Sequence, residues 1–332
     1  PLKDKNGEWE KVSLALPGRT LYARIWRVDV GRIPLYLLDT DFDENWNEDR
    51  GVTATLYGGD VENRLKQEML LGIGGMRMLN LLGEKPTLFH LNEGHAAFLG
   101  LERVYQIMQE EHVNMSVATE LVRASSLYTT HTPVPAGHDA FHEDLMRTYF
   151  ASFPERYNIS WENFMGLGRK RDDYTNDKFS MSILACRFSQ EINGVSRIHG
   201  RVSREMFADL YEGRFAEESH IGYVTNGVHY PTWAHKKWQQ LHLETFGEEF
   251  ASDRSNPDFW NKIEQVDDGR IWQIKQELRK EMFDDIKPML NEQMRRRNES
   301  PALINNTLKA IRDDVLTIGF ARRFATYKRA HL

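Results

Sequence analysis

The chain has 332 residues, of which 40% are hydrophobic and 28% are charged, a composition that is typical of a globular protein and argues against a disordered or fibrous one. Its 43 Lys and Arg residues against 49 Asp and Glu residues give a net charge of −6. Nucleic-acid-binding proteins usually carry a basic excess, so we expect no nucleic-acid partner. There is neither an apolar run of about 18 residues nor an apolar leader segment, so we expect no membrane partner and no secretion. The single cysteine, Cys186, cannot form an internal disulfide, which favours a cytoplasmic protein.

The first 82 residues predict a small antiparallel sheet followed by a helix. Three short runs alternate apolar and other residues between turns that contain Gly or Pro, as antiparallel strands do: 12–16, 21–27 and 33–38. Residues 40–60 are polar and predict a loop. Over 62–82 the apolar spacing becomes three and four, which predicts a helix. Each glycine within 72–75 costs about 1 kcal/mol relative to Ala in a helix, so we expect close backbone packing there.

Four short apolar segments predict further strands, because each ends in polar or Gly-containing residues: 87–91, 126–129, 194–198 and 221–224. Helical spacing separates most of them, over 96–111, 181–191 and 203–211. Alternating strands and helices predict a mostly parallel sheet of the α/β class. Open α/β sheets bind ligands at the carboxyl ends of their strands, so we expect the function there.

The last part of the chain predicts charged helices over 250–313 and a strand over 316–320. A basic run follows this strand and comprises Arg322, Arg323, Lys328 and Arg329. Such a run is usually a solvated surface, but directly after a strand its cations could also converge on a phosphate.

The sequence HLNEGH at 90–95 places a carboxylate, Glu93, and an imidazole, His95, two residues apart after a predicted strand. The pair suits hydrogen bonding to a hydroxylated ligand or acid–base chemistry. The alternative is structural, since Asn92 and Glu93 could cap the helix that begins near Ala96. The spacing alone favours the capping interpretation.

The loop TTHTPVPAGH at 129–138 contains two prolines and a glycine, so it is stiff enough to present backbone carbonyls in fixed directions. His131, His138 and His142 also allow a metal site, since the last two stand four residues apart. The sequence lacks the full HExxH pattern, and acids such as Asp139 could pair with these histidines in solvent. We therefore expect no metal.

Asn226 lies in the sequence TNGVH at 225–229. Asn-Gly is a common turn at the end of a strand, and an Asn amide placed there could also hold a sugar hydroxyl. Neither a GxGxxG, a Walker A nor a GxSxG sequence is present.

Six segments of the chain, in this order, resemble the α-glucan phosphorylases, the family of the glycogen, starch and maltodextrin phosphorylases. They span nearly the whole chain: LYGGDVENRLKQEMLLGIGG (56–75), HLNEGHAAF (90–98), YTTHTPVPAGHDAF (128–141), NGVSRIHGRVSREMF (193–207), VTNGVHYPTW (224–233) and GFARRFATYKRA (319–330). The second and third resemble the shorter bacterial and archaeal branch.

The resemblance implies a GT-B type α/β fold, with a cleft between two Rossmann-like domains. It assigns residues 1–250 to the second part of the N-terminal, glucan-binding domain, 251–313 to a helical connector and 314–332 to the start of the C-terminal domain. The family's Schiff-base lysine and one of its Gly-rich loops fall outside these segments. We therefore expect the chain to be an internal fragment that is inactive by itself.

The resemblance also implies a retaining transferase, in which inorganic phosphate cleaves the terminal α-1,4-glucosyl bond of a glucan and yields glucose 1-phosphate. His131 is similar to the histidine whose main-chain carbonyl faces the reacting glucosyl unit. Glu93 and His95 occupy positions beside the sugar, and Asn226 resembles the residue that holds the glucose 6-hydroxyl.

The family uses pyridoxal phosphate through its phosphate group. Arg323 and Lys328 resemble the residues that hold the substrate phosphate, and Arg322 lies near the position of the cofactor phosphate, where the animal enzymes have Lys. Guanidinium and ammonium groups stabilise charge on a transferring phosphate, although the two are not equivalent.

Two other functions remain open. A GT-B glucosyltransferase of the glycogen synthase type would use a nucleotide-sugar and no pyridoxal phosphate. A non-catalytic glucan-binding module would use aromatic platforms, for which the candidates are Trp161, Trp233, Trp238 and Tyr230. The sequence leaves a homo-oligomer open as well.

Overall fold

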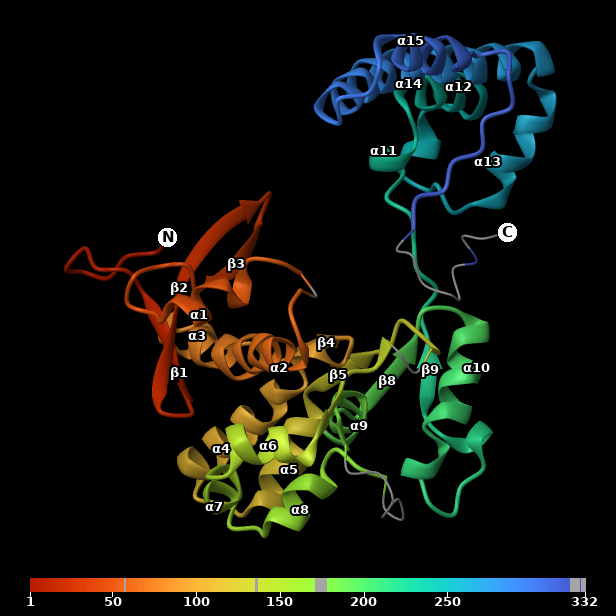
Figure 1. The fold of residues 1–332 in the computed structure, drawn as a ribbon. Coiled ribbons are helices and arrows are strands. Elements are labelled where there is room, and N and C mark those ends of the chain that lie inside the picture. The colour runs from red at the N-terminus through yellow and green to blue at the C-terminus, as the bar shows by residue number, and fades with distance from the viewer. Residues whose placement is uncertain (57, 135–136, 171–177, 323–328, 330–332) are drawn as a thin grey trace. The chain divides into compact units, whose positions relative to one another are not determined.

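The structure is a computed structural model that describes residues 1–56, 58–134, 137–170, 178–322 and 329 (Figure 1). The chain divides into two compact units, Pro1–Asn226 and Gly227–Leu332. The first unit contains the sheets, and the described part of the second is helical. No helix within these described ranges is both long and apolar enough to cross a membrane.

Within the described ranges, the strands belong to the first unit, which also contains ten α-helices. The strands are β1 (Lys11–Leu16), β2 (Arg19–Val30), β3 (Ile33–Asp39), β4 (Phe89–Asn92), β5 (Ser126–Thr129), β6 (Ala140–His142), β7 (Lys178–Ser180), β8 (Glu191–Gly194) and β9 (Ile221–Tyr223). The helices of the first unit are α1 (Asn47–Arg50), α2 (Val61–Met69), α3 (Gly75–Leu81), α4 (Phe98–Glu111), α5 (Met115–Ala124), α6 (Glu143–Phe150), α7 (Phe153–Tyr157), α8 (Trp161–Gly166), α9 (Met181–Arg187) and α10 (Arg197–Met206). Those of the second unit are α11 (Tyr230–Trp233), α12 (Lys236–Phe246), α13 (Pro257–Asn261), α14 (Asp268–Arg296) and α15 (Pro301–Ala310).

The predicted antiparallel sheet is present as β1-β2-β3. Its alternation buries one face, since Leu14 pairs with Leu21 across β1 and β2 and both side chains are buried. The period of two therefore fixes which face of this sheet packs on the core.

The central sheet is parallel, in the order β4-β5-β8-β9. Each strand contributes one buried apolar side chain to a row across the sheet, and these four side chains are register partners: Leu91, Tyr128, Ile192 and Ile221. α4 packs on α5, and α10 packs on β8 and β9 (Figure 1). The α/β class predicted from the sequence is confirmed.

The long insertion between β5 and β8 is attached to α4 by aromatic side chains. Phe98 of α4 lies 4.8 Å from Phe150 of α6 and 6.2 Å from Phe179 of β7, measured between ring centroids. Phe164 of α8 lies 5.9 Å from Phe179. All four rings are fully buried, so this cluster positions the antiparallel pair of strands β6 and β7 and the loop that leads into β6.

The strand predicted over 194–198 is wrong, and so is the start of the helix predicted over 203–211. The strand β8 ends at Gly194, and α10 already begins at Arg197. The signal for this early start is Ser196, whose side chain accepts the His199 N–H and caps the helix. A Cβ on Gly194 would lie 2.8 Å from the Gly200 backbone nitrogen, so this glycine permits the close approach of α10.

The strand predicted over 316–320 is also absent from the structure. Leu316 and Ile318 are 85% and 86% exposed. A strand is stabilised by hydrogen bonds to a neighbouring strand, and none of the strands in the described ranges lies beside this segment.

The helix predicted over 62–82 is present but is not continuous. The π-helical turn Leu70–Gly74 separates α2 from α3, at the glycine-rich part of the helix. A Cβ on Gly72 would lie 2.6 Å from the backbone nitrogen of Leu99, which confirms the expected close packing. Beyond the turn, Arg77 donates to Glu102 of α4 and to the Ser13 carbonyl of β1, both at 2.8 Å.

We expect Gly72→Ala to destabilise the chain by about 1–3 kcal/mol, because the new methyl group would overlap the α4 backbone. Gly75→Ala is the matched control, since a Cβ at Gly75 meets nothing within 4 Å and Ala is favoured over Gly in a helix by about 1 kcal/mol. Urea denaturation of both variants measures the difference. Equal stability of the two would contradict the packing argument.

Candidate functional site

Polar loops meet at the carboxyl edge of the parallel sheet. Beyond the ends of the strands, the Glu93 N–H donates to the Thr129 carbonyl at 2.9 Å, and the Asn226 N–H donates to the Val195 carbonyl at 3.1 Å. Together with the bond from the Thr130 N–H to the Asn193 carbonyl at 3.0 Å, these bonds hold the four strand-end segments side by side. They bring together the segments that contain Glu93, His95, His131 and Asn226.

Glu93 adopts a backbone conformation that is rare for any residue with a side chain. Its φ is 67° and its ψ is 176°, a region that is otherwise nearly restricted to glycine and costs of order 1–3 kcal/mol. Its Oε1 accepts the His131 N–H at 2.7 Å, while its buried Oε2 has no hydrogen-bond partner among the described residues. This rare backbone conformation therefore directs the Glu93 carboxylate toward the loop that follows β5.

The capping interpretation of this segment is wrong. The turn Gly94–Ala96 and α4 both lack a side-chain cap, because Asn92 and Glu93 point to the neighbouring loop instead. The ring of His131 donates from Nε2 to the Asn92 amide oxygen at 2.5 Å. The last residue of β4 thus holds the His131 side chain, and the residue that follows it holds the His131 main chain.

His138 closes the same loop on itself. Its Nε2 donates to the Thr132 carbonyl at 2.8 Å, and its Nδ1 lies 2.6 Å from the Ser182 hydroxyl. Both ring nitrogens are therefore engaged within the protein. The sequence offered His131, His138 and His142 as possible metal ligands. In the part of the chain that the structure describes, none of the three lies in a group of side chains that could bind one metal ion together.

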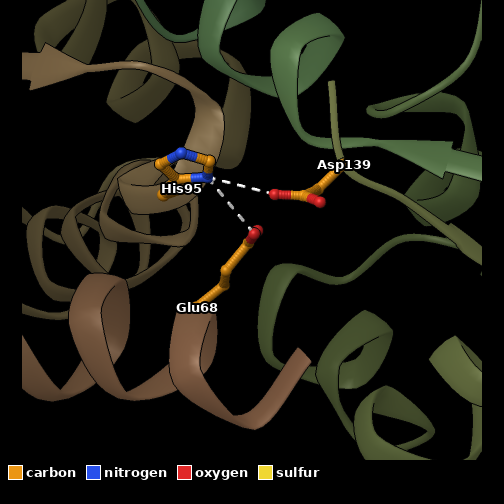
Figure 2. Close-up of side chains that lie close together, drawn as sticks. All are labelled: Glu68, His95 and Asp139. Atoms are coloured by element: carbon orange, nitrogen blue, oxygen red, sulfur yellow. Dashed lines mark hydrogen bonds and ion pairs between the residues drawn. The ribbon is translucent and has the colours of Figure 1, made fainter. Parts of the chain in front are cut away.

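The far end of the loop is held by a polar cluster around the buried side chain of Glu68 (Figure 2). His95 Nδ1 lies 3.1 Å from Asp139 Oδ2 and 3.5 Å from Glu68 Oε1. Glu68 comes from α2, and its side chain is 1% exposed. Asp139, which immediately precedes β6, pairs with His95 and Arg64. The sequence had suggested instead that it pairs in solvent with the histidines of its own loop.

Arg64, one turn before Glu68 on α2, completes this cluster. Its Nη2 lies 2.5 Å from His95 Nδ1, 2.9 Å from Asp139 Oδ2 and 3.2 Å from Glu68 Oε1. Glu68, His95 and Asp139 are close enough together to share a metal ion. However, the guanidinium already contacts all three and supplies the positive charge that a metal would bring.

The cluster shifts the pKa of its members in opposite directions. Burial raises the pKa of Glu68 to about 8. Burial lowers the pKa of His95, but hydrogen bonds to Asp139 and Glu68 outweigh it and raise this pKa to about 9. Although burial also acts on Asp139, its hydrogen bonds hold the pKa of that carboxyl well below the usual range.

The turn after β8 is fixed by a buried imidazole, that of His199. His199 Nδ1 accepts the Val195 N–H at 3.1 Å, so the neutral ring is the form that fits. Burial lowers the pKa of His199 accordingly. Asn226, whose N–H donates to the Val195 carbonyl, is positioned by the same turn and is exposed.

Of the predicted phosphate-binding residues, Arg323 and Lys328 lie outside the described residues. Arg322 is described and exposed, and no carboxylate within the described ranges pairs with its guanidinium.

The four aromatic residues considered as sugar platforms differ in exposure. Trp233 is 77% exposed. Trp161 is half-buried and donates to Glu143 at 2.8 Å. Tyr230 and Trp238 are both half-buried against the His242 ring. One of the four therefore offers a free ring surface.

Comparison with known proteins identifies the family. Residues 76–329 match the carbohydrate phosphorylase family. The chain belongs to this family. The matched range contains Glu93, His95, His131, Asn226 and Arg322, whereas Arg64 and Glu68 precede it.

Individual relatives agree with the family. Over its whole length the chain is 41% identical to a glycogen phosphorylase of Mycobacterium tuberculosis and 39% identical to a maltodextrin phosphorylase of Thermococcus litoralis, of which it covers 39% and 38%. Over 99% of its length it is 31% identical to a glycogen phosphorylase of Aquifex aeolicus, of which it covers 47%. The chain thus spans less than half of these carbohydrate phosphorylases.

Sequence reasoning missed Arg64 and Glu68. The available signal was their i, i+4 spacing on α2 beside Leu65 and Met69, which are both buried, because a charged pair that borders an apolar helix face needs a partner. Nothing in the sequence of this family member shows that the partner is His95.

We expect Glu93→Ala to release the loop that contains His131. A hydrogen bond to a charged group is worth about 1.5–3 kcal/mol, so amide exchange of His131 should accelerate roughly ten- to hundredfold. Hydrogen exchange of a peptide covering this residue measures the change. Glu110→Ala, an exposed site on α4, is the control, and unchanged exchange in the Glu93 variant would show that the carboxylate does not hold the loop.

Proposed function

We propose that this chain is part of an α-1,4-glucan phosphorylase, a retaining glycosyltransferase that transfers the terminal glucosyl unit of a glucan to inorganic phosphate. Membership of the carbohydrate phosphorylase family supports this proposal, as do relatives named glycogen phosphorylase and maltodextrin phosphorylase. The product is α-glucose 1-phosphate.

The observation that carries the proposal is the double attachment of His131. Its N–H is bonded to Glu93 at 2.7 Å and its ring to Asn92 at 2.5 Å, which leaves its carbonyl in a fixed direction. A fixed acceptor suits a reaction in which a glucosyl unit must be held still while the bond at its C1 is exchanged. The strain at Glu93 is the cost of this preorganisation.

In this proposal Glu93, His95 and Asn226 bind the sugar. The buried Oε2 of Glu93 has no partner in the described chain and can accept from a hydroxyl. Asn226 is exposed at the edge of the sheet, where its amide can hold the glucose 6-hydroxyl. The roles of Glu93 and Asn226 thus use an acceptor and a side-chain amide that have no hydrogen-bond partner among the described residues.

The same proposal assigns the phosphate to Arg323 and Lys328, since cations stabilise the charge that develops on a transferring group. Pyridoxal phosphate fits the donor set, because Arg322 presents a guanidinium that no carboxylate in the described ranges neutralises. Arg322 would contact the cofactor phosphate. When bound, the cofactor would supply a phosphate group that exchanges a proton with inorganic phosphate.

We further propose the GT-B architecture. In it, residues 1–250 form the second part of the glucan-binding domain, 251–313 a helical connector, and 314–332 the start of the second domain. The family of the chain and its parallel α/β sheet are what support this arrangement. A cytoplasmic location and self-association are further predictions.

The decisive experiment uses the full-length protein with maltodextrin and inorganic phosphate. We expect glucose 1-phosphate to form, with a lysine adduct of pyridoxal phosphate that borohydride reduces. Glucosyl transfer from a nucleotide-sugar without such an adduct would instead favour a synthase. Retention on starch without either reaction would favour a glucan-binding module.

In the full-length enzyme, we expect Arg323→Ala to lower the rate of phosphorolysis by about 10²–10³, the effect of removing one donor from developing charge. Lys328→Ala should act in the same direction but less, because an ammonium is a point donor. Arg329→Ala is the control, because Arg329 is exposed and surface charges contribute about 0–1 kcal/mol. Equally small losses at all three positions would place the phosphate site elsewhere.

A further inference from the structure

The segment that leaves β8 lies between two other strand-end segments at the carboxyl edge of the parallel sheet. On the side of β5, the Asn193 carbonyl accepts the Thr130 N–H at 3.0 Å. On the side of β9, the Val195 carbonyl accepts the Asn226 N–H at 3.1 Å. Asn193 belongs to β8, whereas Val195 lies beyond its end. The sheet therefore fixes the first of these bonds but not the second.

Val195 is held instead by the side chain of His199, from the first turn of α10. The imidazole Nδ1 accepts the Val195 N–H at 3.1 Å, and the side chain is buried. The His199 N–H donates to the Ser196 hydroxyl, which caps the helix at this point. Val195 is thus bonded on both sides, with its N–H on the helix and its carbonyl on Asn226.

Two glycines allow α10 to lie this close to the strand ends. A Cβ on Gly194 would lie 2.8 Å from the Gly200 nitrogen and 2.9 Å from His199 Nδ1. A Cβ on Gly200 would lie 2.9 Å from the Gly222 carbonyl oxygen of β9. Contacts this short leave no room for a side chain. The position of the His199 ring is therefore set by the packing of α10 on β8 and β9.

The other ring nitrogen of His199 belongs to the side of the loop that follows β5. Its Nε2 is buried and has no hydrogen-bond partner among the described residues. Burial lowers the pKa of His199, and the nearby backbone of Thr132 opposes this shift. Thr132 directly follows His131, so the ring lies between the segment of His131 and the segment of Asn226.

We propose that His199 is a positioning residue that sets the place of Asn226 through Val195, and so the recognition of the glucose 6-hydroxyl. The contact of Asn226 with that hydroxyl rests on the proposed function, whereas the bonds that place Asn226 do not. A neutral imidazole with a bare Nδ1 can accept from the backbone, which a charged imidazole cannot. Asn226 is itself exposed, so little packing supports it and the bond to Val195 has to hold it.

The test compares glucose 1-phosphate with 6-deoxyglucose 1-phosphate as donors for glucan synthesis by the full-length protein. The quantity measured is the ratio of their kcat/KM values. His199→Ala should lower this ratio roughly three- to tenfold, the effect of one lost hydrogen bond. The loss should fall on glucose 1-phosphate, because the analogue has no 6-hydroxyl to lose. An unchanged ratio would overturn the proposal.

Two further substitutions separate the two nitrogens of the ring. The amide oxygen of Asn can take the place of the histidine Nδ1, whereas the amide nitrogen of Gln can take the place of Nε2. His199→Asn should therefore keep the discrimination for the 6-hydroxyl, and His199→Gln should lose it. The reverse order would mean that the side facing Thr132 matters, and would contradict the proposal. If His199→Ala does not fold, this pair of variants decides the question.

Ser203→Ala is the matched control. Ser203 lies one turn later on α10, is buried, and donates within the helix to the His199 carbonyl at 2.8 Å. Its substitution should lower the stability of the protein in urea without changing the ratio of the two donors. An equal fall of the ratio in this variant would show that general loosening of α10 is the cause, and would remove the positioning role of the ring.

A second measurement does not depend on activity. In His199→Ala, the amides of Val195 and Asn226 should exchange with solvent roughly three- to tenfold faster, since each hydrogen bond contributes modestly. In His199→Asn neither should change. Unchanged exchange at Asn226 in the Ala variant would overturn the proposal. If the full-length protein uses neither donor, the proposed function fails, while hydrogen exchange still shows whether His199 holds Asn226.

Discussion

The hydrogen bond from the His131 N–H to the Glu93 carboxylate is the contact on which the strand-end loops depend. It joins the loop after β4 to the loop after β5 at 2.7 Å, at a point where both have left the regularity of the sheet. The sheet can place the ends of its strands but not the loops beyond them. Glu93, in its glycine-like backbone conformation, sets the direction of the chain beyond β4. The row of buried side chains from Leu91 to Ile221 makes the sheet rigid enough to maintain this strained conformation.

The opposite end of the same loop is held by charge rather than by backbone geometry. Asp139 is anchored by Arg64 and by His95, so the two residues that bracket the turn after β4, Glu93 and His95, hold the loop at 131 and at 139. The aromatic cluster around Phe98 fixes the antiparallel β6–β7 pair into which the loop runs. Hydrogen bonds, ion pairs and packing therefore act on different described parts of this irregular segment.

The sequence predicted those features that depend on short-range patterns. Period-two alternation identified β1 to β3, and polar residues after apolar runs identified the edge where the site lies, with the strand over 126–129 matching β5 to the residue. The predictions were wrong where tertiary contacts determine the local structure. Ser196 begins α10 inside an apolar segment, and Leu316 lacks a neighbouring strand in the described chain. Glu93 has the side chain of a helix cap, yet its backbone turns it toward His131. Arg64 and Glu68 are far from Asp139 in sequence, so no local pattern joins them.

The π-helical turn between α2 and α3 makes the length of this segment as important as its composition. α2 directs Arg64 and Glu68 to the polar cluster, whereas α3 directs Arg77 to Glu102 and Ser13. A π turn accommodates one more residue than a regular helical turn, and each residue of an α-helix rotates the chain by about 100°. Loss of a single residue within 70–74 would restore a regular helix and rotate one of these two sets of contacts away from its partners. Between related sequences this segment should therefore rarely gain or lose a position, and an alignment that opens a gap here would shift one of the two helices out of register.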